Sequence, residues 1–126
     1  MTHHRNVLRF FMRLQNMLKL YHWSTRSYHR HQASDMLINK LDPLIDRFVE
    51  IFLQNFGRPD MISFKGIALR VNKFDDATIL DALEKVSQEI STGSIATIAE
   101  SFPELCNIRD EMLSCIKQAH FLLTME

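Results

Sequence analysis

Apolar side chains recur every three or four residues along most of the chain, and this period constrains the fold more than any other feature. It is the period of amphipathic α-helices, which bury one face and expose the other. The chain has only three Gly and three Pro in 126 residues, whereas β-sandwiches and barrels need a turn about every 8 to 12 residues. The sequence therefore predicts an all-α fold, and its length suits a single domain over residues 1–126.

The apolar period predicts four long helices joined by one long connection. Their expected ranges are 5–24, 28–56, 76–102 and 103–125. A short, weakly patterned helix is expected within 61–72, inside the connection between the second and third helices. Four long helices with one long crossover are the layout of ferritin-like bundles, and we predict that architecture.

Pro43 and Gly93 leave alternatives open within these helices. Pro43 lies inside the second helical pattern, where proline removes a backbone hydrogen bond at a cost of about 3 kcal/mol. The helix is expected either to kink there or to restart, with Asp42 as N-cap and Pro43 as the first helical residue. In the third helix, Asp76 is the predicted N-cap and Gly93 can bend the helix.

The formal net charge is zero at pH 7, but the charges are unevenly placed. Residues 1–34 contain six Lys or Arg, five His and no acid, so all 15 acids follow. We interpret the first helix as a basic element that packs against acidic helices of the same bundle or of a neighbouring subunit. An organelle transit peptide and a nucleic-acid-binding helix are the alternatives. The Lys-rich tail that would support DNA binding is not present in this sequence.

The cysteine content and hydropathy point to a cytoplasmic protein. Two Cys without a preceding apolar signal segment indicate free thiols in a reducing compartment. No apolar run approaches the roughly 20 residues that cross a bilayer, so we expect no membrane partner. Motifs for serine, cysteine or phosphate chemistry are also missing from the sequence.

Four residues of the second helix could bind a metal ion. His31, Asp35, Asp46 and Glu50 are separated by four, eleven and four residues, which places them on one stripe of a helix. Each pair spaced i, i+4 presents two ligands on one face. Imidazole nitrogen together with carboxylate oxygen suits a cation such as ferrous iron. The alternative is that these residues are solvated positions on the helix exterior.

The spacing also predicts an oligomer. His31 and Asp46 are fifteen residues apart along a continuous helix, which is too far for one ion to contact both pairs of the same chain. A second copy related by a twofold axis would supply the missing pair of ligands, and the symmetry would create two equivalent centres. Tyr21-His22-Trp23, at the end of the first helix, adds a third nitrogen ligand and an indole near the same site.

These residues resemble the pattern of the Dps-type mini-ferritins. That pattern has a His-Trp at the end of the first helix, followed by a His and an Asp four residues apart. A second pair, an Asp and a Glu four residues apart, begins eleven residues after the first Asp. In this chain it corresponds to His22-Trp23, His31 with Asp35, and Asp46 with Glu50. The resemblance covers residues 5–57 by motif and the remainder by helix lengths and the crossover.

The resemblance implies a ferroxidase with a di-iron centre at a twofold interface, inside a hollow homo-oligomer, a dodecamer. Such a protein oxidises ferrous iron with peroxide or dioxygen, stores the mineral and protects against oxidative stress. By this resemblance, His22 of one subunit and Asp46 with Glu50 of its mate would hold the tighter iron, and His31 with Asp35 would hold or orient the second. Trp23, together with Tyr21 or Tyr28, would intercept oxidising equivalents.

Other interpretations of the same residues remain open. Trp23 could instead pack at the subunit interface. The whole chain could be a ferritin-like structural or interaction subunit that has lost catalysis. Among the other histidines, His3 and His4 are interpreted as part of a frayed terminus or as leftover tag residues, with binding of a surface metal ion as the alternative. His29 is interpreted as an additional imidazole near the site, and His120 as a packing residue.

Overall fold

The computed structural model describes residues 2–60 and 75–125, and within these ranges every regular element is an α-helix. The helices are α1 (Thr2–Ser24), α2 (Tyr28–Phe56), α3 (Ile79–Thr92), α4 (Ser94–Ala99) and α5 (Pro103–Leu123). The predicted all-α class is confirmed. None of the described helices combines the length and hydropathy that a bilayer crossing requires.

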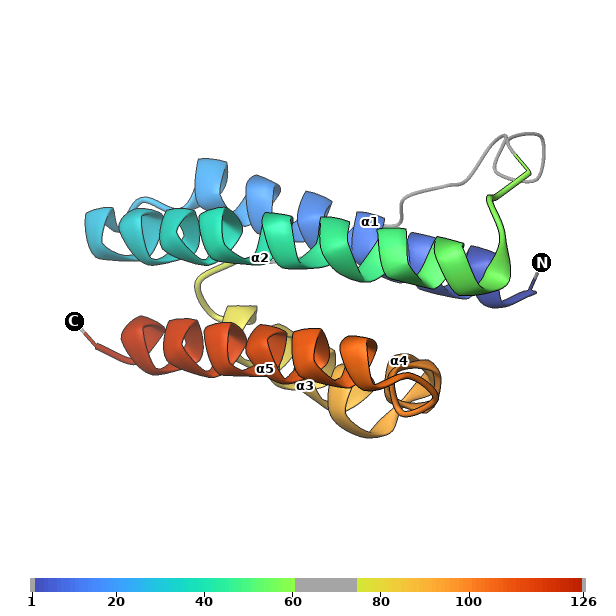
Figure 1. Ribbon diagram of the computed structural model, residues 1–126. Coiled ribbons are helices and arrows are strands. Elements are labelled where there is room, and N and C mark those ends of the chain that lie inside the picture. The colour runs from blue at the N-terminus through green and yellow to red at the C-terminus, as the bar shows by residue number, and fades with distance from the viewer. Residues whose placement is uncertain (1, 61–74, 126) are drawn as a thin grey trace.

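The helices form two layers, with α1 and α2 in one and α3, α4 and α5 in the other (Figure 1). Asp76, just before α3, contacts Tyr21 near the end of α1 and Arg30 near the start of α2. At the other end, the Phe56 ring of α2 lies 5.8 Å from the Phe102 ring that precedes α5. Thus α2 and α3 run in the same direction. The predicted short helix at 61–72 lies outside the described residues.

Helix α2 has the bounds that its sequence predicts. Ser27 is the N-cap, and its hydroxyl accepts a hydrogen bond from the Arg30 amide at 3.2 Å. Gly57 ends the helix with φ of +87° and donates its N–H to the Leu53 carbonyl at 2.8 Å. A positive φ of this size favours glycine because it has no Cβ.

Pro43 does not divide α2 into two helices. The helix runs unbroken through it, and the side chain of Pro43 is exposed on the outer face. Asp42 does not cap a new segment, because its carboxylate accepts a hydrogen bond from the Gln15 side chain of α1 at 3.3 Å. The expected restart at Asp42 is therefore wrong.

The third predicted helix is divided in two at Gly93. A Cβ at this position would lie 2.8 Å from the Glu89 carbonyl oxygen. This distance is too short for a side chain, so the backbone at the break favours glycine. The Glu89 carboxylate accepts a hydrogen bond from the Ser94 amide at 3.0 Å, which satisfies a free donor at the start of α4. The predicted bend is thus a full interruption.

Asp76 is not the N-cap of α3, which corrects the prediction. Thr78 occupies that position and makes no side-chain cap. The neighbouring Asp75 carboxylate accepts from the backbone amides of Ala77 and Thr78, each at 3.1 Å. Asp76 is therefore free to turn back toward the end of α1.

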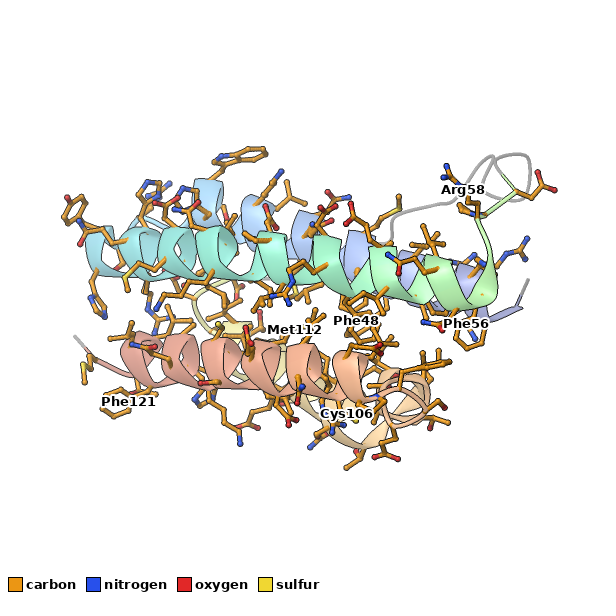
Figure 2. All side chains as sticks on the ribbon, viewed as in Figure 1. Phe48, Phe56, Arg58, Cys106, Met112 and Phe121 are labelled. Carbon is orange, nitrogen blue, oxygen red and sulfur yellow. The ribbon has the colours of Figure 1, made fainter. Side chains whose placement is uncertain are left out.

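The core lies between the two layers, where the apolar faces of the helices meet. Phe48 of α2 and Met112 of α5 both point into this space (Figure 2), and both are completely buried. Helix α2 is central, because it packs against α1 on one side and α5 on the other. Burial of these apolar faces is the main stabilising term for such a bundle.

His4 is buried, so its interpretation as part of a frayed terminus is wrong. Its side chain is only 5% exposed, and Nε2 donates to the Gly57 carbonyl oxygen at 2.6 Å. The ring also meets Phe52 edge-on with centroids 5.2 Å apart. His4 therefore links the first turn of α1 to the end of α2.

Candidate metal centre

The connection between α1 and α2 brings the end of one helix beside the start of the other. Helix α1 ends at Ser24, and α2 begins at Tyr28, after only three intervening residues. The Thr25 amide still donates to the Tyr21 carbonyl at 2.9 Å, so the chain turns directly after the last helical bond. The last turn of α1 and the first turn of α2 therefore lie side by side.

His22 and His31 contact one another at this turn. Their rings stack with centroids 3.8 Å apart and an interplanar angle of 17°. His22 Nδ1 lies 2.9 Å from the His31 carbonyl oxygen, and His31 Nδ1 lies 2.8 Å from the His22 carbonyl oxygen. Each ring is thus held by the backbone of the other residue.

These two contacts show which ring nitrogen carries the proton in this structure. A carbonyl oxygen only accepts hydrogen bonds, so both Nδ1 atoms must be donors. In a neutral imidazole with a proton on Nδ1, the Nε2 atom keeps its lone pair. Both rings are therefore held in the tautomer that offers Nε2 as a metal ligand. Metal-binding histidines commonly show this second hydrogen bond.

Asp35 lies next to the histidine pair. One of its oxygens, Oδ1, is 4.0 Å from His22 Nε2. The other, Oδ2, accepts a hydrogen bond from Asn39 at 3.4 Å, one helical turn further along α2. The Asp35 side chain is 56% exposed, so its carboxylate is accessible to an incoming cation.

Ser34 is a site residue that the sequence analysis missed. It is only 2% exposed, although its side chain is polar. Its hydroxyl lies 2.9 Å from His22 Nδ1 and donates to the His31 carbonyl oxygen at 3.0 Å. The sequence does carry a signal for this burial, because Ser34 lies three residues before Leu37 and seven before Leu41, on the apolar face of the helix.

Asp46 and Glu50 do not join the histidines within one chain. Both are exposed on α2, and Asp46 is fifteen residues from His31, which is about 22 Å along the helix axis. Asp46 lies in the groove between α1 and α2, beside Met12 and Gln15. Within residues 2–60 and 75–125, no three His, Cys, Asp or Glu side chains of a single chain form a metal-binding group.

The aromatic residues predicted near the site have different environments. Trp23 is 71% exposed and Tyr28 is 74% exposed. Tyr21, by contrast, is 1% exposed, and its hydroxyl donates to the Asp76 carboxylate at 2.8 Å. Arg30 in turn donates to the Tyr21 hydroxyl oxygen at 3.2 Å.

These surroundings alter the acidity of Tyr21. Burial raises the pKa of the Tyr21 hydroxyl above its usual value of 10.0. The Asp76 carboxylate also raises this pKa, since it accepts the hydroxyl proton and repels the phenolate, whereas Arg30 lowers it. The neutral phenol is therefore the stable form of Tyr21 in the folded protein.

Two other histidines make contacts away from the His22–His31 pair. His29 donates from Nε2 to the Leu122 carbonyl oxygen at 2.6 Å, near the end of α5. His120 Nε2 lies 3.4 Å from the Glu84 carboxylate of α3. The contact made by His29 links α2 to α5 and does not favour its interpretation as an additional ligand.

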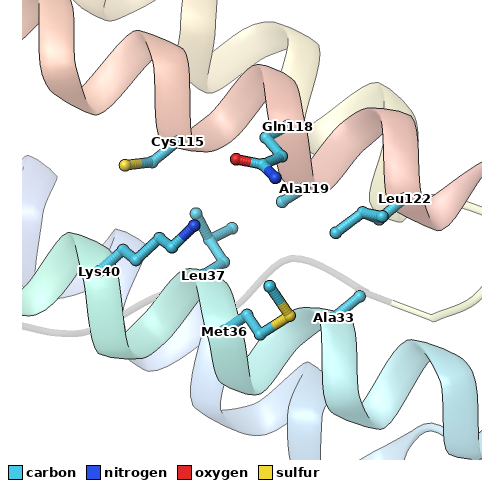
Figure 3. Close-up of a pocket in the computed structure, with 8 residues that line it drawn as sticks. All are labelled: Ala33, Met36, Leu37, Lys40, Cys115, Gln118, Ala119 and Leu122. Atoms are coloured by element: carbon cyan, nitrogen blue, oxygen red, sulfur yellow. The ribbon is translucent and has the colours of Figure 1, made fainter.

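A recess between α2 and α5 is a poorer candidate for a functional site. Figure 3 shows Ala33, Leu37 and Ala119 around it, with Lys40 and Cys115 close by. Its lining is mainly apolar and brings no carboxylate or imidazole together. The end of the α1–α2 hairpin is therefore the best candidate in the described part of the chain.

A family model described as "Family of unknown function (DUF5856)" matches residues 22–123. The chain belongs to DUF5856. It is also similar to the "Uncharacterized 14.6 kDa protein in mobD-ri intergenic region" of Enterobacteria phage T4. The two are 30% identical over 105 residues, which cover 83% of this chain and 75% of the phage protein. No solved structure gives a significant match.

The DUF5856 match includes the whole candidate site. It begins at His22 and extends past Glu50, so all five predicted ligands lie inside it. The DUF5856 description assigns no activity, and the printed name of the phage protein assigns none. A function for the chain must therefore be argued from the geometry of the site.

Proposed function

We propose that this protein is an iron-oxidising and iron-storing protein of the ferritin-like type, with a di-iron ferroxidase centre between two subunits. The observation that carries the proposal is the stacked His22–His31 pair, in which both Nδ1 atoms are engaged by backbone carbonyls. This arrangement leaves a lone pair on Nε2 of both rings, and Nε2 of His22 lies 4.0 Å from an oxygen of the Asp35 carboxylate. The parallel α2 and α3, joined by one long connection, further support a ferritin-like topology.

The donor set fits ferrous iron. Imidazole nitrogen and carboxylate oxygen bind divalent first-row metals. A metal ion about 2.1 Å from each ligand can bridge a nitrogen and an oxygen that are up to ~4.2 Å apart. The 4.0 Å between His22 Nε2 and Asp35 Oδ1 lies within this limit. One chain would therefore supply half of a centre.

A second copy of the chain can supply the other half by simple symmetry. Asp35 and Asp46 are equally distant from the step between Lys40 and Leu41 of α2. His31 and Glu50 are also equally distant from this step. A twofold axis there, with antiparallel α2 helices, brings Asp35 opposite the partner's Asp46 and His31 opposite the partner's Glu50. All four residues are exposed on α2 and are available for such a contact.

Ferrous iron is the substrate of the proposed reaction. Two ferrous ions each lose one electron, and one peroxide takes up both electrons with two protons to give two waters. Facing carboxylates stabilise the higher charge of the ferric product more than that of the ferrous ion. Trp23 follows His22 directly and would accept oxidising equivalents that escape the centre.

The test is an anaerobic ferrous titration followed by air or peroxide. The wild-type protein should give a ferric absorbance band and then mineral. The double variant Asp46→Ala with Glu50→Ala should lose at least about 100-fold in the oxidation rate, because it removes two of the carboxylates that hold the ions. Glu104→Ala with Glu111→Ala is the matched control, since both residues are exposed carboxylates on α5.

Three outcomes of this titration would contradict the proposed ferroxidase function. No turnover by the wild-type protein, or equal turnover by the Asp46 and Glu50 double variant, would overturn it. A loss in the control double variant as large as that in the site variant would also count against it, because general loss of charge would then be the cause.

A structural or interaction subunit is the second candidate function. It is favoured by the exposure of Trp23 and Tyr28, at 71% and 74%, because large exposed aromatic rings are typical of contact surfaces. This candidate predicts that Trp23→Ala weakens self-association while purified protein neither retains nor oxidises iron.

A further inference from the structure

We infer that Ser34 is a positioning residue, whose hydroxyl holds His22 with its proton on Nδ1 and so keeps Nε2 available for the cation. The Ser34 side chain is polar, yet it is buried and contacts both histidines. The identity of the cation rests on the proposed function, whereas the effect of Ser34 on the imidazole does not.

The hydrogen bonds around Ser34 fix the direction of its hydroxyl. The Ser34 hydroxyl donates to the His31 carbonyl oxygen at 3.0 Å. Its only proton is used in that bond, so the oxygen faces His22 Nδ1, 2.9 Å away, as an acceptor. His22 Nδ1 thus has two acceptors, the Ser34 hydroxyl oxygen and the His31 carbonyl oxygen.

A competing acceptor lies on the other side of the His22 ring. Asp35 Oδ1 is 4.0 Å from Nε2, which is beyond hydrogen-bond distance but near enough to attract a proton on that atom. With the proton on Nε2, His22 has no lone pair on that nitrogen, and the lone pair on Nδ1 faces Ser34 and the His31 carbonyl rather than Asp35. Ser34 therefore opposes Asp35 in the choice of tautomer, and loss of its hydroxyl shifts His22 toward the form that offers no ligand beside Asp35.

The first readout is the tautomer of His22 in metal-free, full-length protein. Long-range proton–nitrogen NMR distinguishes Nδ1–H from Nε2–H in an imidazole ring. The His22 signals are assigned by their loss in His22→Gln. We expect the Nδ1–H form in the wild-type protein, a mixture in Ser34→Ala, and recovery of the Nδ1–H form in Ser34→Thr, which restores the hydroxyl.

The second readout is the affinity for Co²⁺, measured by its absorption spectrum. Ser34→Ala should bind Co²⁺ about 10-fold more weakly than the wild-type protein, the usual effect of removing a residue that orients a metal ligand. Ser91→Ala is the matched control, because Ser91 also lies near the carbonyl of the residue three positions earlier, at 3.5 Å, but contacts no histidine. It should change neither readout.

The two readouts fail separately. An unchanged His22 tautomer in folded Ser34→Ala overturns the role of Ser34, whatever the metal result. If Ser34→Ala does not fold, a wild-type or Ser34→Thr protein with the proton on Nε2 overturns it equally. A wild-type protein that binds no Co²⁺ contradicts the proposed function instead, while a tautomer shift in Ser34→Ala would still support the inference.

Discussion

At the scale of single residues, the stacked imidazoles determine what the end of the α1–α2 hairpin can bind. The sequence identified His22 and His31 as candidate ligands from their residue types and the His-Trp pair. It could not predict that each ring bonds to the backbone of the other, because this depends on the path of the three residues between the helices. Ser34 was missed for a related reason, since its role appears only when α1 packs on α2.

Tyr21 gives a prediction at the same scale. Its hydroxyl is buried and donates to Asp76, so Tyr21→Phe should lower the free energy of unfolding by about 1 kcal/mol near pH 7. The folded pKa of Tyr21 is raised above 10.0. This stabilisation is therefore fully present below pH 10 and is lost as pH rises through the folded pKa.

Urea unfolding of both proteins between pH 7 and about pH 11 measures this effect. The difference in unfolding free energy between wild type and Tyr21→Phe should shrink above pH 10. Tyr28→Phe is the control, because Tyr28 is 74% exposed and should show a small difference with no such trend. A difference that grows with pH would mean that Tyr21 is ionised in the folded state.

At the scale of helices, α2 was predicted with the correct bounds because its signals are local. Ser27 and Gly57 are cap residues that act on their own helix. The start of α3 was predicted less well, because two adjacent aspartates could serve as caps and only the tertiary contact with Tyr21 distinguishes them. The Gly93 interruption likewise depends on the position of the Glu89 side chain.

Pro43 gives a prediction at the helix scale. It lies inside α2 with its side chain exposed, and it cannot donate to the carbonyl of Asn39 one turn earlier. Pro43→Ala should restore that hydrogen bond and raise the free energy of unfolding by about 2 kcal/mol, after allowance for the greater freedom of the unfolded chain.

Chemical denaturation of Pro43→Ala measures this gain. Lys40→Ala, an exposed substitution on the same helix, is the control and should stay within about 0.5 kcal/mol of the wild-type protein. A loss of stability in Pro43→Ala would show that the core is fitted to a bend in α2 that only proline maintains.

At the scale of the whole molecule, one chain holds the histidine pair at the end of the α1–α2 hairpin and the carboxylates of Asp46 and Glu50 further along α2. The sequence predicted this separation from spacing alone, and it motivated a second subunit. The arrangement of residues in the described chain is consistent with that reasoning, because Asp46 and Glu50 stay exposed and unassociated with the histidines. The oligomer itself stays a prediction.

Mixed subunits test the central claim most directly. One variant carries His22→Ala with His31→Ala, and the other carries Asp46→Ala with Glu50→Ala. Each alone should oxidise ferrous iron at the background rate. Co-expressed in equal amounts, they form hybrid dimers in which one of the two centres is intact, so roughly a quarter of wild-type activity should return. A mixture as inactive as its two components would contradict a centre shared between subunits.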